Sequence, residues 1–383
     1  MTDYWKILPL GDLCDILDYR RKPVTKRDRK LGAYPYYGAT GLLDYVDEFL
    51  FDEKLVLIGE DGAKWGAGEN SAYIIEGKSW VNNHAHVLRP NRNMIMDEWI
   101  VYYINFSDLT EFVTGLTVPK LNQAKLREIP IPVPPLPEQR RIVHILDEAF
   151  AAIAVARTNA EKNLQNAREV FQGYLNEVIS QCVQTCQLST LGELFDITSS
   201  KRVFESEWKR EGVPFYRARE IVILSKQGYV NNELFISEEM FREYSTKFGI
   251  PKDGDIMVTG VGTLGICYVV RKNDRFYFKD GNIIWLKKRT NVNSHFVEFA
   301  FKSDFLRKQI DDSIGATVGT YTIIKAKGTQ IPLPPLKEQN EIVTNFQSIS
   351  EKTKQLETIY LRKIASLDAL KQSLLHQAFS GEL

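Results

Sequence analysis

The chain has 383 residues, enough for two domains with separate hydrophobic cores. No apolar run reaches the ~18 residues of a membrane span, and the first residues lack a signal-peptide pattern, which argues against a membrane or secreted protein. The formal net charge is zero, which argues mildly against nucleic acid without excluding it, because binding depends on where the charges lie.

The four cysteines, Cys14, Cys182, Cys186 and Cys267, do not make a disulfide framework in a chain of this size, which favours a reducing cytoplasm. Cys182 and Cys186 have helical spacing. No histidine or second cysteine pair lies nearby, so thiols at a helix end explain the pair better than a metal site does.

The first 130 residues predict a mixed α/β domain. Apolar runs at residues 55–58 and 85–88 end at turn residues and predict strands, and residues 97–106 have a helical pattern. Residues 20–30 are densely basic and lie between a predicted strand and the turn at residues 34–38, so they form a loop. A solvated surface and a nucleic-acid contact both explain this loop.

A proline-rich phrase, IPIPVPPLPEQRRIV at residues 129–143, ends this domain. Its consecutive prolines exclude helix, and Glu138 then lies in the first turn of a long helix, where the helix dipole favours an acid. Apolar residues follow in steps of four and three, the period of a helix seam. The expected seam positions are Ile142, Leu146, Ala149, Ile153, Ala156, Ala160, Asn163, Ala167, Val170 and Tyr174.

The second half predicts the same order of elements. Strands are expected at residues 255–258, 266–270 and 282–286 and a helix at residues 295–305. The phrase IPLPPLKEQNEIV at residues 331–343 then leads into a second long helix. Its expected seam positions are Ile342, Phe346, Ile349, Thr353, Leu356, Tyr360, Leu367, Leu370 and Leu374, with Lys363 interrupting.

These parallels form an internal repeat. Pro135 matches Pro335 at an offset of 335 − 135 = 200, and the rest of the phrase keeps that offset. The same offset relates Gly115, Thr117 and Val118 to Gly315, Thr317 and Val318. Residues 10–13, LGDL, echo residues 191–194, LGEL, at an offset of 192 − 11 = 181. Between these matching segments the two halves of the chain barely resemble each other. The chain therefore consists of two copies of one structural unit whose intervening sequences differ, and we expect it to bind a partner that also has two halves.

Each long helix is expected to run about 40 residues, or roughly 60 Å at 1.5 Å per residue, and its apolar stripe needs a partner. The predicted fold class is α/β, with two mixed α/β domains that are each followed by a long helix. We expect the two helices to pack as an antiparallel coiled coil with pseudo-two-fold symmetry, so that each ends at the other unit's globular domain. A parallel coiled coil with another protein is the alternative.

The sequence contains segments that resemble catalytic or nucleotide-binding motifs, but the residues around them do not fit those motifs. Residues 260–265 match GxGxxG, but a strand follows instead of a helix, so a hairpin turn is the better interpretation. Residues 77–79, GKS, lack the first glycine of a phosphate loop, and residues 52–54, DEK, lack the acidic motif that precedes them in nucleases. His84 and His86 lie in a strand pattern without further ligands. We therefore expect no catalytic site, no cofactor and no metal.

A variable domain, the motif IPLPPL-x-EQ and a long helix follow one another twice along the chain. This order closely resembles that of the specificity subunit of type I restriction–modification systems. Further matches are residues 10–13, the turn at residues 35–39, the glycine segments before each phrase and the ending QAFSGEL at residues 377–383. The resemblance covers the whole chain. The extra residues in the first phrase, and Pro137 where the second has Lys337, do not change the assignment.

The resemblance implies a non-catalytic, cytoplasmic subunit that binds double-stranded DNA and does not bind membranes. Two target-recognition domains each read one half of a bipartite, asymmetric sequence. The helices separate them and dock methyltransferase subunits, expected to number two, which carry S-adenosylmethionine and the chemistry; restriction (motor-nuclease) subunits can join. The expected boundaries are 1–136 for the first domain, 137–186 for the central helix, 187–336 for the second domain and 337–383 for the C-terminal helix.

Candidate DNA-binding residues are the cationic, amide and hydroxyl side chains on loops, because phosphate contacts position a protein and base-edge contacts specify sequence. In the first domain they are Arg20, Arg21, Lys22, Lys26, Arg27, Lys64, Asn82, Asn83, Lys120 and Asn122. In the second domain they are Ser199, Ser200, Lys201, Arg202, Arg217, Arg219, Thr259, Thr263, Lys279, Asn282, Thr320 and Tyr321.

Two rival functions stay open on the residues alone. An enzyme that cuts or modifies DNA by itself would need motor, methyltransferase or nuclease motifs, which the sequence does not show. A structural coiled-coil adaptor unrelated to DNA would leave the basic loop and the divergent interiors unexplained. Binding of S-adenosylmethionine tests the first, and a DNA gel shift with the methyltransferase partner tests the second.

Overall fold

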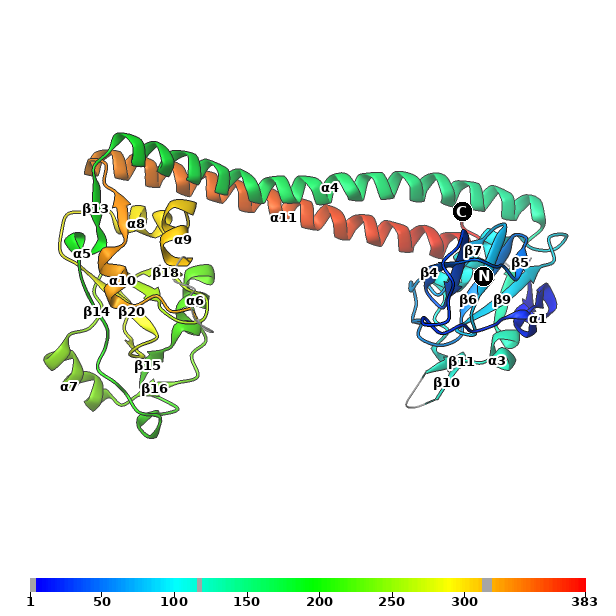
Figure 1. Cartoon of the computed structure of the whole chain (residues 1–383), viewed down its shortest axis with the longest axis horizontal. Coiled ribbons are helices and arrows are strands. Elements are labelled where there is room, and N and C mark those ends of the chain that lie inside the picture. The colour runs from blue at the N-terminus through cyan, green and yellow to red at the C-terminus, as the bar shows by residue number, and fades with distance from the viewer. Residues whose placement is uncertain (1–4, 116–118, 312–318) are drawn as a thin grey trace. The chain divides into compact units, whose positions relative to one another are not determined.

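The computed structural model describes residues 5–115, 119–311 and 319–383, and the chain divides into two compact units (Figure 1). The first unit combines residues 1–161 with residues 361–383, and the second comprises residues 162–360. Each unit therefore holds one globular part and portions of two long helices. The repeat matches at Thr117, Val118, Gly315, Thr317 and Val318 lie outside the described residues.

The first unit is built on two four-stranded sheets. One is antiparallel with the order β2-β9-β6-β7, and its strands are Cys14–Ile16, Ala85–Pro90, Leu55–Gly59 and Ala72–Ile75. The other has the order β4-β3-β8-β5 with β3 and β8 parallel, and its strands are Gly41–Val46, Tyr34–Gly38, Lys78–Val81 and Phe51–Asp52. Every residue of β6 is buried, which explains its unbroken apolar run.

Short elements complete this unit. Two further antiparallel pairs are β1 (Lys6–Pro9) with β12 (Pro130–Val133), and β10 (Val113–Thr114) with β11 (Lys120–Leu121). The helices are α1 (Leu10–Leu13), η1 (Asp18–Arg20), α2 (Asp97–Phe106), η2 (Thr110–Phe112) and α3 (Gln123–Glu128). The helix expected at residues 97–106 is confirmed as α2, whose buried Trp99, Ile100 and Ile104 share a core with the β2-β9-β6-β7 sheet.

The second unit repeats this plan. Its antiparallel sheet has the order β14-β20-β17-β18, with strands Phe195–Thr198, Ile283–Lys288, Ile256–Thr259 and Cys267–Val269. A three-stranded sheet, β16-β15-β19, has strands Phe235–Ile236, Val213–Tyr216 and Tyr277–Phe278, with β15 and β19 parallel. The strand β13 (Leu188–Thr190) pairs with β21 (Gln330–Pro332) as β1 pairs with β12.

The helices of the second unit carry its main departures from the first. They are α5 (Leu191–Leu194), η3 (Glu205–Glu207), α6 (Ala218–Gln227), α7 (Glu238–Phe248), α8 (Ser294–Ala300), α9 (Asp304–Asp311) and α10 (Ile323–Gly328). The helices α6 and α7 lie between β15 and β17 and accommodate the longer interior of this copy. The helical pattern expected at residues 295–305 is confirmed in part, because the helix is interrupted between α8 and α9. There the Ser303 hydroxyl accepts from the amide of Leu306 and begins a new helix.

Strand register proves the correspondence between the copies. Ile58 pairs with His86 in the first unit, and Val258 pairs with Ile284 in the second. The hairpin expected at the GxGxxG segment is confirmed, because β17 and β18 pair antiparallel on either side of it. The divergent interiors thus hold one sheet topology with different side chains.

The repeated glutamine of the proline-rich phrase has the same structural role in both copies. Gln139 and Gln339 are both buried. Each donates to the carbonyl of the proline five residues before it, at 2.8 Å in both units. Each also accepts from the backbone amide just before α2 or α8, from Met96 at 2.9 Å and from Asn293 at 2.8 Å. This side chain fixes the start of each long helix against its domain, which explains why the phrase occurs twice.

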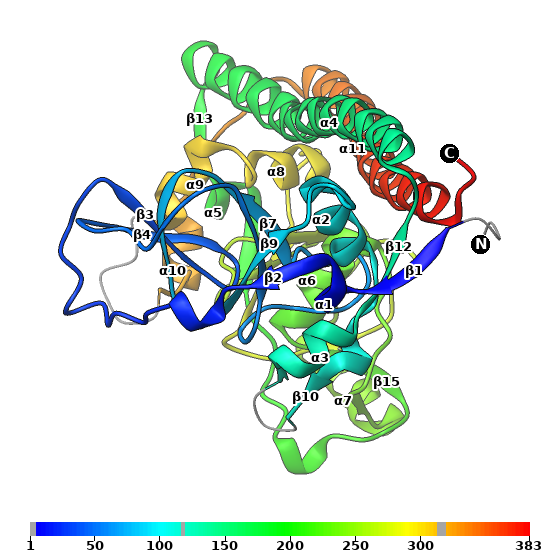
Figure 2. The same ribbon diagram turned by 90° about the vertical axis from the view of Figure 1, so that its right-hand side faces the viewer.

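The long helices are α4 (Leu136–Thr185), of 50 residues, and α11 (Leu336–Ser380), of 45 residues. They lie side by side in Figures 1 and 2. Ion pairs join Arg157 to Asp368 in the first unit and Arg168 to Glu357 in the second, the latter at 3.2 Å. Because the partner number falls as the α4 number rises, the helices run antiparallel, as expected.

The predicted seam of these helices is only partly confirmed. On α4, Leu146, Ile153, Ala160 and Ala167 are buried as expected. Two predicted positions are wrong: Asn163 and Val170 are exposed, and their neighbours Leu164 and Phe171 face inward instead.

The same displacement occurs on α11. Phe346 and Thr353 are buried, whereas Leu356 and Leu370 are exposed and Glu357 turns inward to meet Arg168. Both helices have apolar residues on two neighbouring stripes of their surface. The position of the partner helix decides which stripe is buried. Periodicity therefore identified the helices but not the complete buried face.

Each unit's core is completed by the far end of a long helix. In the first unit, Leu375, Ala378 and Phe379 of α11 join the cluster that contains Ile142 and Leu146 of α4. In the second, Leu175 and Ile179 of α4 join the cluster that contains Val343 and Phe346 of α11. The expectation that each helix ends at the other copy's globular domain is confirmed.

Candidate nucleic-acid interface

Loops from four parts of the first unit meet at one end of its antiparallel sheet. The amide of Glu60 donates to the carbonyl of His84 at 2.8 Å, and the amide of Leu121 donates to the carbonyl of Glu60 at 2.8 Å. The Leu17 amide donates to the Val87 carbonyl at 2.8 Å, so the loop after β2 lies at the same end. We call this end, formed by residues 17–22, 59–64, 82–86 and 120–123, the loop edge.

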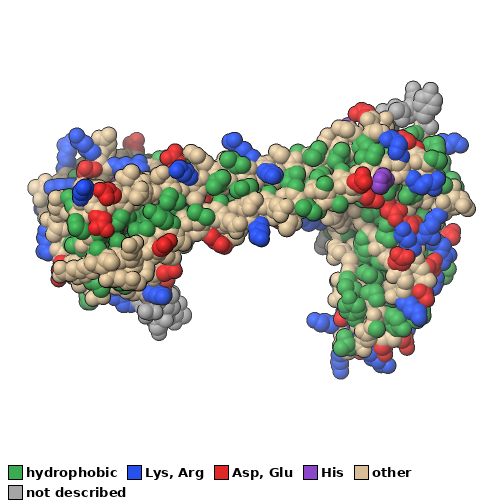
Figure 3. Space-filling view, turned by 90° about the horizontal axis from the view of Figure 1, so that it is seen from above, with side chains coloured by type: hydrophobic (Ala, Val, Ile, Leu, Met, Phe, Trp, Pro, Cys, Tyr) green, Lys and Arg blue, Asp and Glu red, His purple; other side chains and the backbone are tan. Residues whose placement is uncertain are grey.

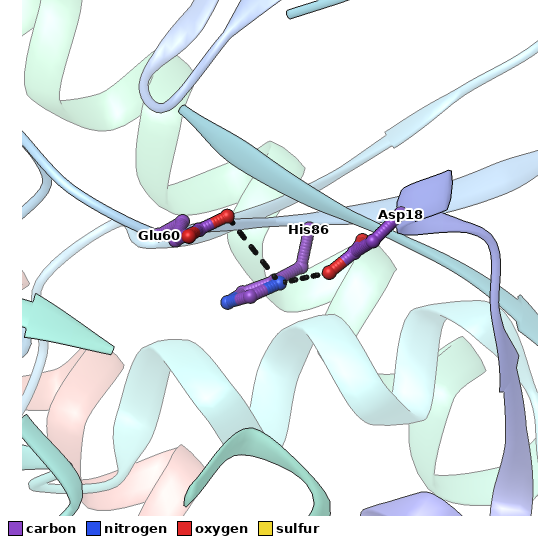
Figure 4. Close-up of side chains that lie close together, drawn as sticks. All are labelled: Asp18, Glu60 and His86. Carbon is purple, nitrogen blue, oxygen red and sulfur yellow. Dashed lines mark hydrogen bonds and ion pairs between the residues drawn. The ribbon is translucent and has the colours of Figure 1, made fainter. Parts of the chain in front are cut away.

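A network of charged side chains lies within the loop edge (Figure 4). Asp18 and Glu60 flank His86, with carboxylate oxygens 2.6 Å and 3.8 Å from its Nδ1. Arg21 forms ion pairs with both carboxylates, and Lys120 lies 2.7 Å from Glu60. His86 is fully buried, so this is an internal network and not a solvated cluster.

Hydrogen bonds engage both ring nitrogens of His86. Its Nε2 lies 2.7 Å from the Leu121 carbonyl, which can only accept, so Nε2 donates. Its Nδ1 lies 2.6 Å from Asp18, whose carboxylate also accepts from the Val87 amide at 2.9 Å and from Gln123 at 3.2 Å. Burial would raise the pKa of Asp18, but the hydrogen bond and charge of His86, with help from Val87 and Arg21, lower it overall.

The same geometry argues against a metal ion at this place. Asp18, Glu60 and His86 offer ligand atoms within 4.8 Å of one another. A metal requires a free imidazole nitrogen, whereas both nitrogens of His86 already have protein partners, Nε2 the Leu121 carbonyl and Nδ1 the Asp18 carboxylate. Arg21 and Lys120 already supply positive charge to the two carboxylates. The cluster is a closed salt-bridge network.

The second unit has the same loop edge with different side chains. The Gly260 amide donates to the Asn282 carbonyl at 2.9 Å, and the Tyr321 amide donates to the Gly260 carbonyl at 2.9 Å. By strand register and the two repeat offsets, Ser199, Gly260, Ile284 and Thr320 stand where Asp18, Glu60, His86 and Lys120 stand in the first unit. These four residues line a cavity of about 410 Å³. A charged network in one copy is thus replaced by an uncharged cavity in the other.

The basic segment of the first unit separates into bound and free cations. Arg20 donates to the Leu50 carbonyl at 2.7 Å and lies 3.4 Å from Glu53, and Arg29 pairs with Asp44 at 3.1 Å. Four further cations of this segment are exposed and take part in no salt bridge among the described residues: Lys22, Lys26, Arg27 and Lys30. Only the second group has charge free to meet a phosphate.

The remaining candidates of the first unit also differ in what they touch. Asn82 is buried and its side-chain oxygen accepts from the amide of His84 at 2.8 Å. Asn122 caps α3 by accepting from the Lys125 amide at 3.0 Å. Asn83 and Lys64 are exposed. The structure brings Arg21, Asn82, Asn83, Lys120 and Asn122 to the loop edge, where some of them have structural contacts of their own.

In the second unit, candidates also gather at the loop edge. Ser199 donates to the Ile283 carbonyl at 3.0 Å and Ser200 to that of Phe278 at 2.7 Å. Thr259 is buried and accepts from the Ile266 amide at 3.0 Å, while Thr263 is exposed in the hairpin turn. Tyr321 is buried, with its hydroxyl 2.7 Å from that of Thr329.

The cationic candidates of the second unit fall into two groups. Arg217 and Arg219 lie at the start of α6 and both pair with buried Glu220, at 2.8 Å and 3.2 Å. Burial would raise the pKa of Glu220, but the hydrogen bonds from Arg217 lower it. The other cationic candidates are close in sequence to residues of the loop edge. Lys201 is exposed, Arg202 pairs with Asp280 at 2.9 Å, and Lys279 lies over the Trp208 ring.

Sequence reasoning missed the carboxylates of the charged network. It noted His86 but found no further ligands, whereas Asp18 and Glu60 both approach its ring. Asp18, Glu60 and His86 are far apart in the sequence and come together only in the folded sheet. Their spacing matches no known motif. The repeat offset of 200 relates Glu60 to Gly260, but only strand register relates His86 to Ile284, so the sequence carried no signal for the network.

Free and bound cations of the basic segment are expected to respond differently to neutralisation. Replacing Lys26, Arg27 and Lys30 together by glutamine should weaken DNA binding and reduce its log–log salt slope by ~0.9 for each phosphate that the protein no longer neutralises. Titrations of fluorescent duplex at several salt concentrations measure this. Adding Arg20 and Arg21 to this set would confound binding with folding, because both are ion-paired.

A matched control for this experiment is Lys162→Gln, an exposed lysine on α4 that takes part in no salt bridge among the described residues. It should leave the slope unchanged. Arg21→Gln should instead lower the thermal midpoint. An unaltered slope in the triple variant would mean that the segment is only a solvated loop.

Comparison with known proteins gives a consistent result. The family model described as type I restriction modification DNA specificity domain matches residues 2–164 and 184–364. A putative type I restriction enzyme specificity subunit from Haemophilus influenzae is 31% identical over 345 residues, covering 89% of this chain and 86% of that protein. The MjaVIII specificity subunit from Methanocaldococcus jannaschii is 22% identical over 409 residues, covering 99% of this chain and 93% of that protein.

Solved structures show the same fold. A chain from a study of complex assembly and conformational transition of the type I R-M system matches with a TM-score of 0.74 at 18% identity, covering 100% of this chain and 99% of that chain. The HsdS subunit from Thermoanaerobacter tengcongensis matches with a TM-score of 0.62 at 18% identity, covering 100% of this chain and 98% of that chain.

Proposed function

Because the chain belongs to the family of type I restriction–modification DNA specificity subunits, we propose that its two α/β domains each read one half of a bipartite, asymmetric DNA target. Specificity subunits are the non-catalytic members of their complexes, so the chemistry belongs to partners. The proposed boundaries are residues 1–136 and 187–336 for the two reading domains.

One observation carries this proposal. The loop edge has the same backbone hydrogen bonds in both units, yet four equivalent positions on it carry Asp18, Glu60, His86 and Lys120 in the first and Ser199, Gly260, Ile284 and Thr320 in the second. Base edges in the major groove differ in their donors and acceptors, so two different side-chain sets on one frame select two different sequences. An asymmetric target follows from two unequal readers.

Methyltransferase subunits, two in number, are the proposed partners of the paired helices, and restriction subunits are further candidates. Several large apolar side chains remain exposed on α4 and α11: Val155, Val170, Leu356, Ile359 and Leu370. Figure 3 shows such hydrophobic side chains between charged ones along the helices. Exposed apolar groups outside the seam between α4 and α11 favour a protein partner. S-adenosylmethionine would be bound by the methyltransferase, not by this chain.

The proposed location is the cytoplasm, where duplex DNA and the partner subunits meet. In the part of the chain that the structure describes, no helix has the length and apolar character needed to span a bilayer.

Exchange of one domain tests the proposal. Replacing residues 1–136 by the corresponding domain of a relative with a different target should change one half-site completely and leave the other unaltered. The phrase at residues 129–143 gives the junction, because its glutamine fixes the helix start in the same way in both copies. Binding sites selected from a random DNA pool, with the methyltransferase present, would give both half-sites.

The reciprocal exchange of residues 187–336 is the matched control and should change only the other half-site. If either exchange altered both half-sites, the two domains would not read independently. If the parent complex selected no sequence at all, DNA specificity itself would be wrong.

A further inference from the structure

We propose that His86 is a positioning residue for the first reading domain, which holds the Leu121 backbone, and with it Lys120 and Asn122, at the loop edge without touching DNA. The inference rests on the proposed reading of DNA by this domain and deepens it. His86 is fully buried, so its effect on DNA must pass through the groups that it binds.

Leu121 is held through both of its backbone polar groups. Its amide donates to the Glu60 carbonyl at 2.8 Å, and its carbonyl accepts from Nε2 of His86 at 2.7 Å. Its neighbours on either side are two of the candidate DNA-binding residues, Lys120 and Asn122. A shift of the Leu121 carbonyl would therefore displace both of them from the edge.

The rest of the network fixes His86 itself. Asp18 lies 2.6 Å from Nδ1 and accepts from Gln123 of α3 at 3.2 Å, so one carboxylate ties the histidine to the helix that follows Leu121. Arg21 and Glu60 complete the surroundings of the ring. Buried ion pairs of this kind are weak evidence for stability, because the cost of desolvating the charges offsets their attraction. Fixing one arrangement of the loops explains the network better.

The second domain places the equivalent residue by another means. The Tyr321 amide donates to the Gly260 carbonyl as the Leu121 amide donates to that of Glu60. Ile284 replaces His86 and has no side-chain donor for the Tyr321 carbonyl. Instead, the Tyr321 ring is buried and its hydroxyl lies 2.7 Å from that of Thr329. Leu121 has no side-chain hydroxyl with which to anchor itself, so in the first domain the hydrogen bond from His86 takes that role.

Two amide substitutions separate the two bonds of His86. In His86→Gln, the amide nitrogen takes the place of Nε2 and can still donate to the Leu121 carbonyl, while the bond to Asp18 is lost. In His86→Asn, the amide nitrogen takes the place of Nδ1 and keeps Asp18, while the bond to Leu121 is lost. Both variants replace the imidazole by a neutral amide, so a difference between them reports the Leu121 bond.

The measurement is the affinity of the full chain with its methyltransferase partner for duplexes that carry single base changes in either half-site. The His86→Asn variant should lose up to about tenfold in discrimination at the first half-site, the range expected for losing one hydrogen bond. The His86→Gln variant should retain most of it. Discrimination at the second half-site should be unchanged in both.

Tyr321→Phe is the matched variant in the second domain, because it removes only the hydroxyl that meets Thr329. It should lower discrimination at the second half-site alone, and it keeps the inference testable if His86→Asn fails to fold. Equal behaviour of the two His86 variants, with the parent still selective, would overturn the role of His86. Loss of the first half-site by Tyr321→Phe would also contradict it. A parent complex without sequence preference would instead overturn the proposed function.

Discussion

Inserting seven residues into each long helix, after Asn163 and after Lys363, is expected to lengthen the spacer between the half-sites by about three base pairs and to leave both half-sites unchanged. Seven residues add ~10 Å of helix at 1.5 Å per residue. DNA rises ~3.4 Å per base pair, so the two lengths correspond. Sequencing the sites methylated by the reconstituted complex measures the spacer directly.

The insertion points follow from the ion pairs between the helices. Asn163 lies about halfway between Arg157 and Arg168, and Lys363 about halfway between Glu357 and Asp368. A seven-residue insertion in both helices preserves the register on each side, because the seam repeats every seven residues.

Two other insertions serve as controls. Seven residues in α4 alone would put the two ion pairs out of register and should reduce assembly. Four residues in each helix would add ~6 Å and also rotate the seam, so activity should fall rather than move to a new spacing. Methylation at the original spacing by the double seven-residue variant would show that the helices do not set the distance.

Replacing Phe379 by alanine is expected to destabilise the first unit by about 3 kcal/mol, although this residue lies at the opposite end of the sequence. Its ring packs on Trp99, Tyr103 and Phe106, with ring centroids 4.9, 5.1 and 5.5 Å away. Removing it would open a cavity in a core that also contains the first turns of α4. Thermal unfolding and limited proteolysis of the full chain would show the loss in residues 5–115 first.

The control for this prediction is Leu370→Ala, in the same helix but 47% exposed, which should change stability little. Recognition of the first half-site should weaken in Phe379→Ala, while that of the second persists. Equal resistance of the Phe379→Ala variant and the parent to unfolding would show that the end of α11 is not part of the first unit's core.

Much of the fold could be predicted because the repeat marks it. The proline-rich phrase and the apolar run of β6 are local signals, and each produced the expected element. The seam was harder, because Val170 and Phe171 are adjacent and both apolar. Only the partner helix determines which one it covers, and sequence periodicity does not contain that information.

The types of residue at the site could be predicted from the sequence, but not which of them are ion-paired and which are free. Arg21 and Arg27 look alike in a basic segment, yet Arg21 pairs with two carboxylates whereas Arg27 is exposed. Glu60 lies far from Arg21 in the chain, and only the sheet brings the two together. Local sequence therefore pointed to residues that lie on the loop edge, but it did not show that these loops meet and it missed the network that organises them.

The discontinuous first unit has a consequence for how the chain is made. Trp99 contacts Trp5 and Phe379, so this core needs segments that are far apart in the sequence. The ribosome makes residues 361–383 after residues 162–360, and until then the first unit has an apolar surface uncovered, although most of it was synthesised earlier. The second unit, residues 162–360, is complete sooner. The domain translated first is thus the last to finish folding, and a chain that stops early carries a permanently open core for proteases to find.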